Sequence, residues 1–372
     1  MTNNYWVHDW AMFRRDEIIR IPQEYNIHKD FTVYAGEDDV KAAFSQLNSL
    51  CSDIYGDIAQ SPEDFGMPMH LKDEYRVFSK QWNDSGQAPY RPFILLYHLF
   101  ICGDISGNAI TVSTEKFRGY KPPPKHLSGI EQKITNPHLL FNKLADYGFV
   151  FEGLRSGKPA SSEIVISYPD NADLLILFKL LADKARNTNH LADFLCCSFR
   201  LMQNDMHTAE DDCVADLADK VHTSLERDFV RAMDETLVSM GLIREPRGGY
   251  EGPGLAYHRS KSKPYSFRMV ARSPDITDFS GEKMLLGLRI RNVENCMEYL
   301  NVCPDSVKQI FTSANHPGCE KRVEKLCKHG VEYKIDGKNY WRCGCCHTPF
   351  NVKPNVKDIP HYIKLVELGE KK

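Results

Sequence analysis

Apolar and polar positions along the chain predict a mainly helical first half and a mixed second half. Between Asp38 and Ile58 apolar side chains recur every three or four residues, after an acidic start that suits a helix N-terminus. Phe93–Cys102 is almost continuously apolar. This run is about half as long as a bilayer span, so it predicts a buried helix and not a membrane segment.

Residues 136–169 predict a capped helix followed by a β-hairpin. Asn136 is a typical N-cap residue, Pro137 suits the first helical position, and Gly148 is placed to end the helix. Two alternating runs then flank residues 156–159, as in a hairpin. With the helix that precedes them, these elements make residues 91–186 resemble a winged-helix module. The resemblance implies that the capped helix enters the major groove of DNA and that the hairpin touches the DNA backbone or the minor groove.

Residues 115–158 hold eight Lys/Arg and four Asp/Glu, a local excess of positive charge that suits phosphate binding. The resemblance implies DNA contacts from three places. They are the segment before the helix (Lys133), the helix itself (His138, Asn142 and Lys143) and the hairpin (Arg155 and Lys158). The expected recognition helix has no arginine, however, and Asp146 would repel DNA. A helix followed by a hairpin is also common in α+β cores, so a fold without DNA contact is the alternative.

The next stretch, residues 205–235, is acidic, with ten Asp/Glu against three Lys/Arg. Apolar side chains recur every three or four residues from Leu217 to Met240. This spacing predicts one long amphipathic helix over 205–245 with a solvated acidic face. Residues 205–240 are a candidate binding surface for a protein partner; the alternative is that their apolar face packs into an internal core.

From Leu255 onward short strands dominate, and Asp336-Gly337 is a strong hairpin turn near the end of the chain. The predicted fold class is α+β. The predicted domains are a helical extension (1–90), a winged-helix-like domain (91–204), the long helix (205–245) and an α+β domain with a cysteine-rich, metal-binding tail (246–372).

Three of the 12 cysteines lie within residues 343–346. Cys319, Cys327, Cys343 and Cys346 form C-x7-C-x15-C-x2-C, and the hairpin between the two pairs would bring them together. Four thiolates suit a closed, structural zinc site, and the tail resembles a zinc ribbon. Cys345 or a neighbouring histidine (His316, His329 or His347) could replace one ligand. Free thiols in a reducing cell and a redox pair are the alternatives to a metal.

A net charge of −3 over 372 residues argues against a globally basic nucleic-acid or membrane-surface protein. The N-terminus lacks a signal-peptide pattern, so the predicted location is the cytoplasm, with no membrane partner. No phosphate loop, HExxH or GxSxG motif occurs, which leaves open whether the chain is an enzyme. The stretch Lys283–Val307 leading into "YWRCGCC" is similar to uncharacterised bacterial proteins, a resemblance that implies no activity.

The leading hypothesis is a cytoplasmic binding protein of the winged-helix transcription-regulator type, with a structural zinc site and DNA as its partner. The alternative, from a different class, is an enzyme or small-ligand sensor with a pocket at the 255–300 sheet of the C-terminal α+β domain.

Overall fold

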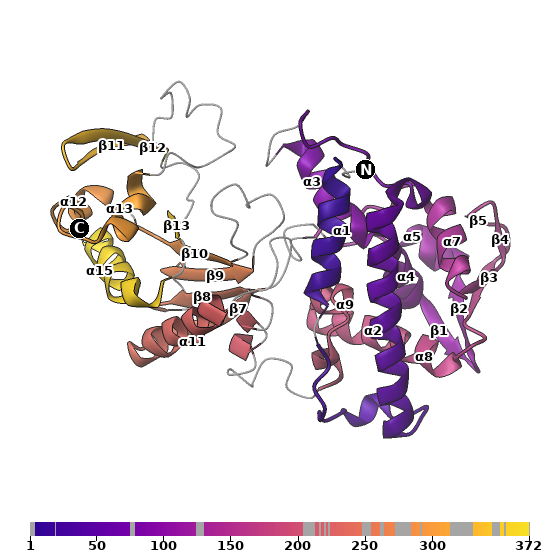
Figure 1. The fold of residues 1–372 in the computed structure, drawn as a ribbon. Helices are drawn as coiled ribbons and strands as arrows, with labels where there is room; N and C mark the ends of the chain where they lie inside the picture. The colour runs from indigo at the N-terminus through magenta and orange to yellow at the C-terminus, as the bar shows by residue number, and fades with distance from the viewer. Residues whose placement is uncertain are drawn as a thin grey trace. The chain divides into compact units, whose positions relative to one another are not determined.

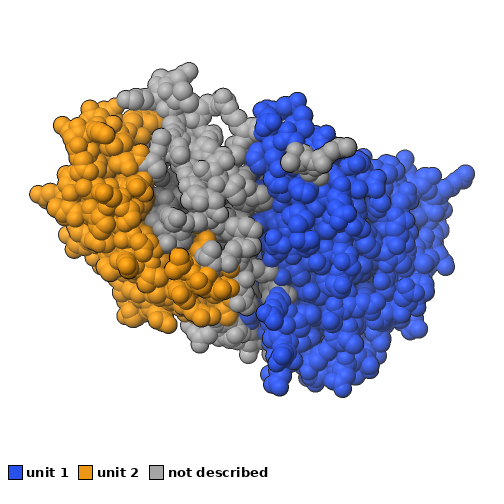
Figure 2. Space-filling model, viewed as in Figure 1, with its two compact units in different colours: residues 1–208 blue, residues 209–372 orange. Residues whose placement is uncertain are grey.

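The computed structural model divides the chain into two compact units, residues 1–208 (unit 1) and 209–372 (unit 2), coloured separately in Figure 2. The residues it describes are 4–18, 20–74, 79–123, 130–203, 213–215, 217–218, 221, 224–247, 254–260, 264–271, 284–290, 292–312, 330–343, 350–352 and 355–371. Of residues 247, 271, 285, 330–331, 342–343 and 350–352 it describes the backbone alone. Both units combine helices with antiparallel sheets, so the predicted α+β class is confirmed.

The helices of unit 1 form its larger part (Figure 1). They are α1 (Trp6–Glu17), α2 (Glu37–Gln60), α3 (Lys80–Gln87), α4 (Arg91–Cys102), α5 (Thr114–Gly119), α7 (Pro137–Asp146), α8 (Ala172–Thr188) and α9 (Leu191–Leu195), with 3-10 turns η1 (Lys29–Phe31), η2 (Pro62–Phe65), η3 (Ala88–Tyr90) and η4 (Phe199–Met202). α4 is buried along almost its whole length because its sequence is apolar on every side. One core joins side chains from 1–90 with those from 91–204, so the predicted extension and the predicted module share a single unit.

The sheet of unit 1 is antiparallel, with strand order β1-β2-β6-β3. Its strands are β1 (Gly103–Ser106), β2 (Ala109–Ser113), β3 (Val150–Glu152) and β6 (Glu163–Ser167). Alternate residues of β2 and β6 are buried, as the period of two in a half-buried strand requires. The predicted hairpin after α7 is present, and it is extended at its tip by β4 (Leu154–Arg155) and β5 (Lys158–Pro159).

Unit 2 is built on a five-stranded antiparallel sheet of order β13-β10-β9-β8-β7. Its elements are α11 (Ser224–Ser239), β7 (Ile243–Arg247), β8 (Gly254–His258), β9 (Phe267–Ala271), β10 (Met284–Leu288), η6 (Val293–Cys296), α12 (Met297–Leu300), α13 (Asp305–Thr312), β11 (Gly330–Ile335), β12 (Lys338–Cys343), β13 (Phe350–Val352), η7 (Val356–Asp358) and α15 (Ile359–Glu370). Side chains of α11, α15 and the sheet form one core, in which the rings of Phe229 and Tyr362 meet edge to face. β11 and β12 form a separate hairpin.

The long helix predicted over 205–245 is not continuous. Within the residues described there, 213–215 and 217–218 are helical, Val221 lies in a bend, and α11 begins only at Ser224. Val214, Leu217 and Val221 are nevertheless buried in the same core as the apolar face of α11. The apolar spacing therefore predicted correctly which side chains are buried on both sides of the bend, but it predicted wrongly that the helix is unbroken.

None of the helices in the described part of the chain combines the length and the apolar character that a bilayer crossing needs.

Candidate nucleic-acid interface and metal tail

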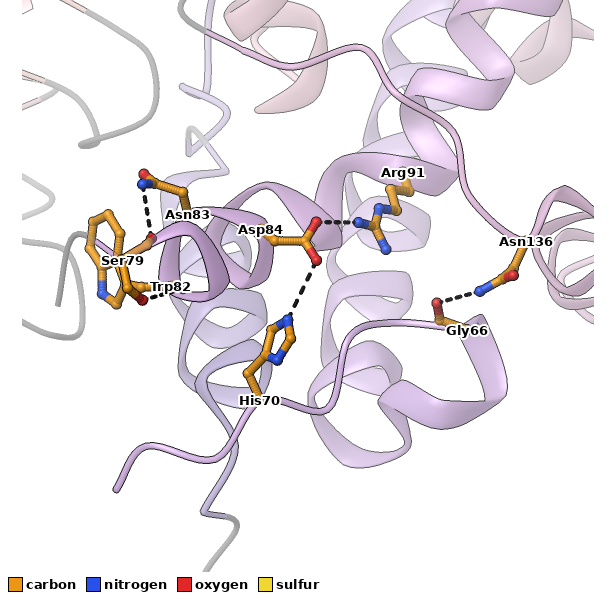
Figure 3. Close-up of polar contacts among 8 residues, drawn as sticks. All are labelled: Gly66, His70, Ser79, Trp82, Asn83, Asp84, Arg91 and Asn136. Atoms are coloured by element: carbon orange, nitrogen blue, oxygen red, sulfur yellow. Dashed lines mark hydrogen bonds and ion pairs between the residues drawn. The ribbon is translucent and has the colours of Figure 1, made fainter. Parts of the chain in front are cut away.

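The start of α7 is fixed by a long-range contact. Pro137 occupies the first helical position as predicted, but Asn136 does not cap the helix with its side chain. Asn136 has a φ of 51°, and its side-chain amide donates to the carbonyl of Gly66, 2.9 Å away (Figure 3). Asparagine tolerates this left-handed conformation better than most residues. Asn136 therefore anchors α7 to the chain segment that follows η2.

The outer face of α7 carries two of the predicted contact residues. Leu140, Phe141 and Leu144 are buried in the unit 1 core, and this fixes how the helix is rotated. His138 and Asn142, four residues apart, are exposed on the other side. Lys133, also predicted, is exposed in the segment that leads to α7.

The hairpin tip lies against the start of α7. Ser156 and Gly157 both have positive φ, as the two central residues do in the tight turns that commonly connect hairpin strands. A Cβ added to Gly157 would lie 2.4 Å from the Cα of His138, so only glycine permits this approach. On the other side of the tip, Arg118 of α5 donates through Nη2 to the carbonyl of Pro159 at 3.1 Å. The tip is thus held from both α7 and α5.

Arg155 and Lys158 face each other across the two short strands of the tip, and both are exposed. Like charges at directly opposed positions of an antiparallel pair lower stability. A polyanionic ligand would relieve this repulsion. The structure therefore brings Arg155, Lys158 and His138 to one end of the module.

Lys143 differs from the other predicted contact residues. Its ammonium lies 3.1 Å from Asp64 of η2 and 3.6 Å from Asp146, and its side chain is only 28% exposed. The hydrogen bond to Asp64 raises the pKa of Lys143. Nearby, the hydroxyl of Tyr147 donates to Asp57 at 2.5 Å. The C-terminal end of α7 is therefore bordered by carboxylates, whereas the tip end carries arginine and lysine.

A polar group lies at α3 (Figure 3), and no motif in the sequence indicates it. One oxygen of Asp84 accepts from Nη2 of Arg91 at 2.7 Å, and the other lies 3.6 Å from Nε2 of His70. The Arg91 side chain is 9% exposed, and burial lowers its pKa, opposed by the charges of Asp84 and Glu131. Because the buried guanidinium is neutralised by its own neighbours, we assign this group to the attachment of α3 to α4.

In unit 2 a buried carboxylate has three donors. Asp234 of α11 accepts from Nε of Arg244 at 2.6 Å, from Nη2 of Arg244 at 2.5 Å and from the Tyr257 hydroxyl at 2.7 Å. Burial raises the pKa of Tyr257, and the charge of Asp234 adds to this effect. These groups satisfy one another, so they tie the helix to the sheet.

The predicted zinc ligands lie mostly outside the described residues. Cys319, Cys327 and Cys346 are not among them, and of Cys343 only the backbone is described, at the end of β12. The described residues contain no group of three or more His, Cys, Asp or Glu side chains able to hold a metal ion. The predicted hairpin is confirmed, with its turn at Asp336-Gly337 and with Gly330 paired to Cys343 at its open end.

The turn end of this hairpin is attached to the helices of unit 2. Lys308 of α13 lies 3.0 Å from both carboxylate oxygens of Asp336, and the hydroxyl of Tyr333 donates to the carbonyl of Phe311 at 2.6 Å. Cys343 is the sixth paired position counted from the turn, five residues beyond Lys338. At a rise of about 3.4 Å per residue, Cys343 lies on the order of 17 Å from the turn.

Comparison with known proteins identifies no relative. No protein-family model, curated protein or solved structure matches this chain.

Proposed function

We propose that unit 1 binds duplex DNA as a winged-helix module and that the chain is a cytoplasmic transcription regulator. The order of its elements carries this proposal: a helix (α4), a strand (β2), two helices (α5 and α7), then two strands (β3 and β6). The first strand pairs with the last, giving the order β2-β6-β3, with β1 added at the edge. This order and pairing resemble those of a winged-helix module, in which α7 would be the recognition helix that enters the major groove.

The distribution of charge favours an approach led by the hairpin tip. Arg155 and Lys158 would contact phosphates, while His138 and Asn142 would reach base edges from the exposed face of α7. Lys143 is ion-paired with Asp64, so its role in this proposal is to hold α7 in place. The carboxylates at the other end of the helix would repel phosphate and thereby set the direction of docking.

Electrophoretic retardation of genomic DNA fragments by the full chain tests this proposal. The double variant Arg155→Glu/Lys158→Glu should clearly weaken retardation at low salt. It replaces one pair of like charges by another, so the cross-strand repulsion stays and the fold is not penalised further. The control Lys334→Glu/Lys338→Glu makes the same charge change at exposed positions of unit 2 and should leave retardation intact. Equal loss in both double variants would contradict a site at the tip.

We also propose a structural zinc ion at the tail of unit 2, held by Cys319, Cys327, Cys343 and Cys346. The register of the β11–β12 hairpin supports it, because Gly330 faces Cys343. Cys327 lies three residues before Gly330, and Cys346 lies three residues after Cys343. The two pairs of cysteines therefore flank the open end of the hairpin, where its two strands lie side by side. Four thiolates would fill a tetrahedral zinc shell and leave no position for water.

Metal analysis of the purified chain should find one zinc ion per chain. Cys343→Ser should lower the zinc content, whereas Cys303→Ser should not, because Cys303 is buried elsewhere in the unit 2 core. A purified chain that contains no metal would refute the zinc proposal without affecting the DNA proposal.

A further inference from the structure

Arg118 of α5 is a basic side chain beside the hairpin tip, and it is not among the predicted DNA contacts. It is exposed, and its Nη2 donates to the carbonyl of Pro159 at 3.1 Å. Pro159 directly follows Lys158, one of the two basic residues that face each other at the tip. The guanidinium of Arg118 is therefore fixed next to the backbone of the strand that carries Lys158.

The hydrogen bond to Pro159 leaves most of this guanidinium available to a ligand. An arginine side chain has five N–H donors, and this bond uses one of them. The two N–H groups of Nη2 belong to different two-nitrogen forks of the guanidinium, so one complete fork remains. Such a fork matches two oxygens of a phosphate, and the bond to Pro159 already orients it.

The basic side chains at the tip have no carboxylate partner, unlike a lysine on the same helix. Lys116, two residues before Arg118, lies 3.6 Å from Asp104. Among the residues that the structure describes, no carboxylate forms an ion pair with Arg118, Arg155 or Lys158. Three positive charges gathered without a counter-ion repel one another, and a bound phosphate would remove that repulsion.

The position of the tip does not depend on Arg118 alone. Thr114, at the start of α5, donates through its amide to the carbonyl of Ser162 and through its hydroxyl to that of Ser161, both at 2.9 Å. On the other side, Gly157 packs against the first turn of α7. Replacement of Arg118 should therefore remove its charge and its donors while the tip stays in place.

We propose that Arg118 is a third phosphate-binding residue of the hairpin tip, which acts with Arg155 and Lys158 on the backbone of bound duplex DNA. This inference rests on the DNA binding proposed for unit 1, and it adds a contact from α5. The remaining fork of Arg118 donates to two oxygens of one phosphate. Because the phosphate contacts then come from a helix and from a strand pair, they restrict the orientation of the tip on DNA more than the strand pair alone would.

The salt dependence of DNA affinity, measured by fluorescence anisotropy with the full chain, separates a phosphate contact from a positioning role. Arg118→Gln removes one charge from the interface. It should weaken binding about tenfold at low salt and reduce the steepness of log affinity against log salt by about 1. The matched control Lys116→Gln removes the same charge from the same helix, where Asp104 already neutralises it, and should keep the wild-type slope.

The possible results distinguish this inference from the proposal on which it rests. If Arg118→Gln keeps the wild-type slope, or if Lys116→Gln reduces it by the same amount, Arg118 is not a phosphate contact even though DNA binding stands. Urea unfolding of Arg118→Gln should match that of the wild-type chain; lower stability with an unchanged slope would assign Arg118 to the fold alone. If the wild-type chain binds no DNA at low salt, the DNA proposal fails and this inference fails with it.

Discussion

Acid should destabilise unit 1 through His98, a buried imidazole on α4. His98 is 5% exposed, its Nε2 lies 3.1 Å from Oε1 of Gln132, and its ring is 4.7 Å from that of Tyr120. Burial lowers the pKa of His98 from 6.5 to about 4, and the hydrogen bond to Gln132 offsets only part of this effect. The folded unit therefore keeps this side chain neutral at pH values where the unfolded chain is protonated.

The sign and size of the effect follow from this difference in pKa. The folded value lies below the unfolded one, so the stabilisation is fully present above about pH 6.5 and is lost as the pH falls towards 4. One pKa unit between the two states corresponds to about 1.4 kcal/mol. Neutral His98 thus contributes about 3 kcal/mol at pH 7, and most of that is lost by about pH 4.5.

Urea unfolding at pH 7 and at about pH 4.5 measures this loss. Three of the four tryptophans lie in unit 1, so Trp341→Phe makes the fluorescence change specific for that unit. In this background His98→Gln should lose about 2 to 3 kcal/mol less stability on acidification than the parent does. The control His138→Gln, at an exposed position, should behave like the parent. If His98→Gln and the parent lose equal stability, the assignment of a depressed pKa to His98 is wrong.

Two further substitutions test the packing directly. Gly157→Ala should cost about 2 kcal/mol or more and weaken DNA retardation, because its Cβ would meet His138. The matched control Gly107→Ala has a similar positive φ but open space around it, and it should cost only about 1 kcal/mol by urea titration. Asp234→Asn should cost about 3 to 5 kcal/mol in unit 2, since it removes the charge partner of buried Arg244; a loss below 1 kcal/mol would contradict that role.

Local signals made α7 and the β11–β12 hairpin predictable. Pro137 and Gly148 set the two ends of α7, and Asp336-Gly337 set the hairpin turn, because each acts through the backbone of its immediate neighbours. The acidic helix is the opposite case. The apolar spacing through Val221 predicted burial correctly and continuity wrongly, since packing does not require an unbroken helix.

Contacts between distant residues could not be predicted from the sequence. Asn136 is a residue type that often caps helices, yet its side chain donates a hydrogen bond to the carbonyl of Gly66, which only the tertiary fold brings near. For the same reason nothing in the sequence distinguished Lys143, which is neutralised by Asp64, from the exposed Arg155. The sequence therefore predicted which residue types are candidate contacts and which elements carry them. Only the fold shows that basic side chains lie at one end of α7 and carboxylates at the other.

The salt dependence of DNA affinity tests DNA binding by unit 1 most directly. Fluorescence anisotropy of a labelled genomic duplex, measured with the full chain from low to physiological salt, should give a logarithm of affinity that falls linearly with the logarithm of salt concentration. Arg155→Glu/Lys158→Glu should reduce the steepness of that fall by about 2, one for each lost phosphate contact. No binding by the wild-type chain at the lowest salt, or the same slope in the double variant, would contradict DNA binding through the hairpin tip.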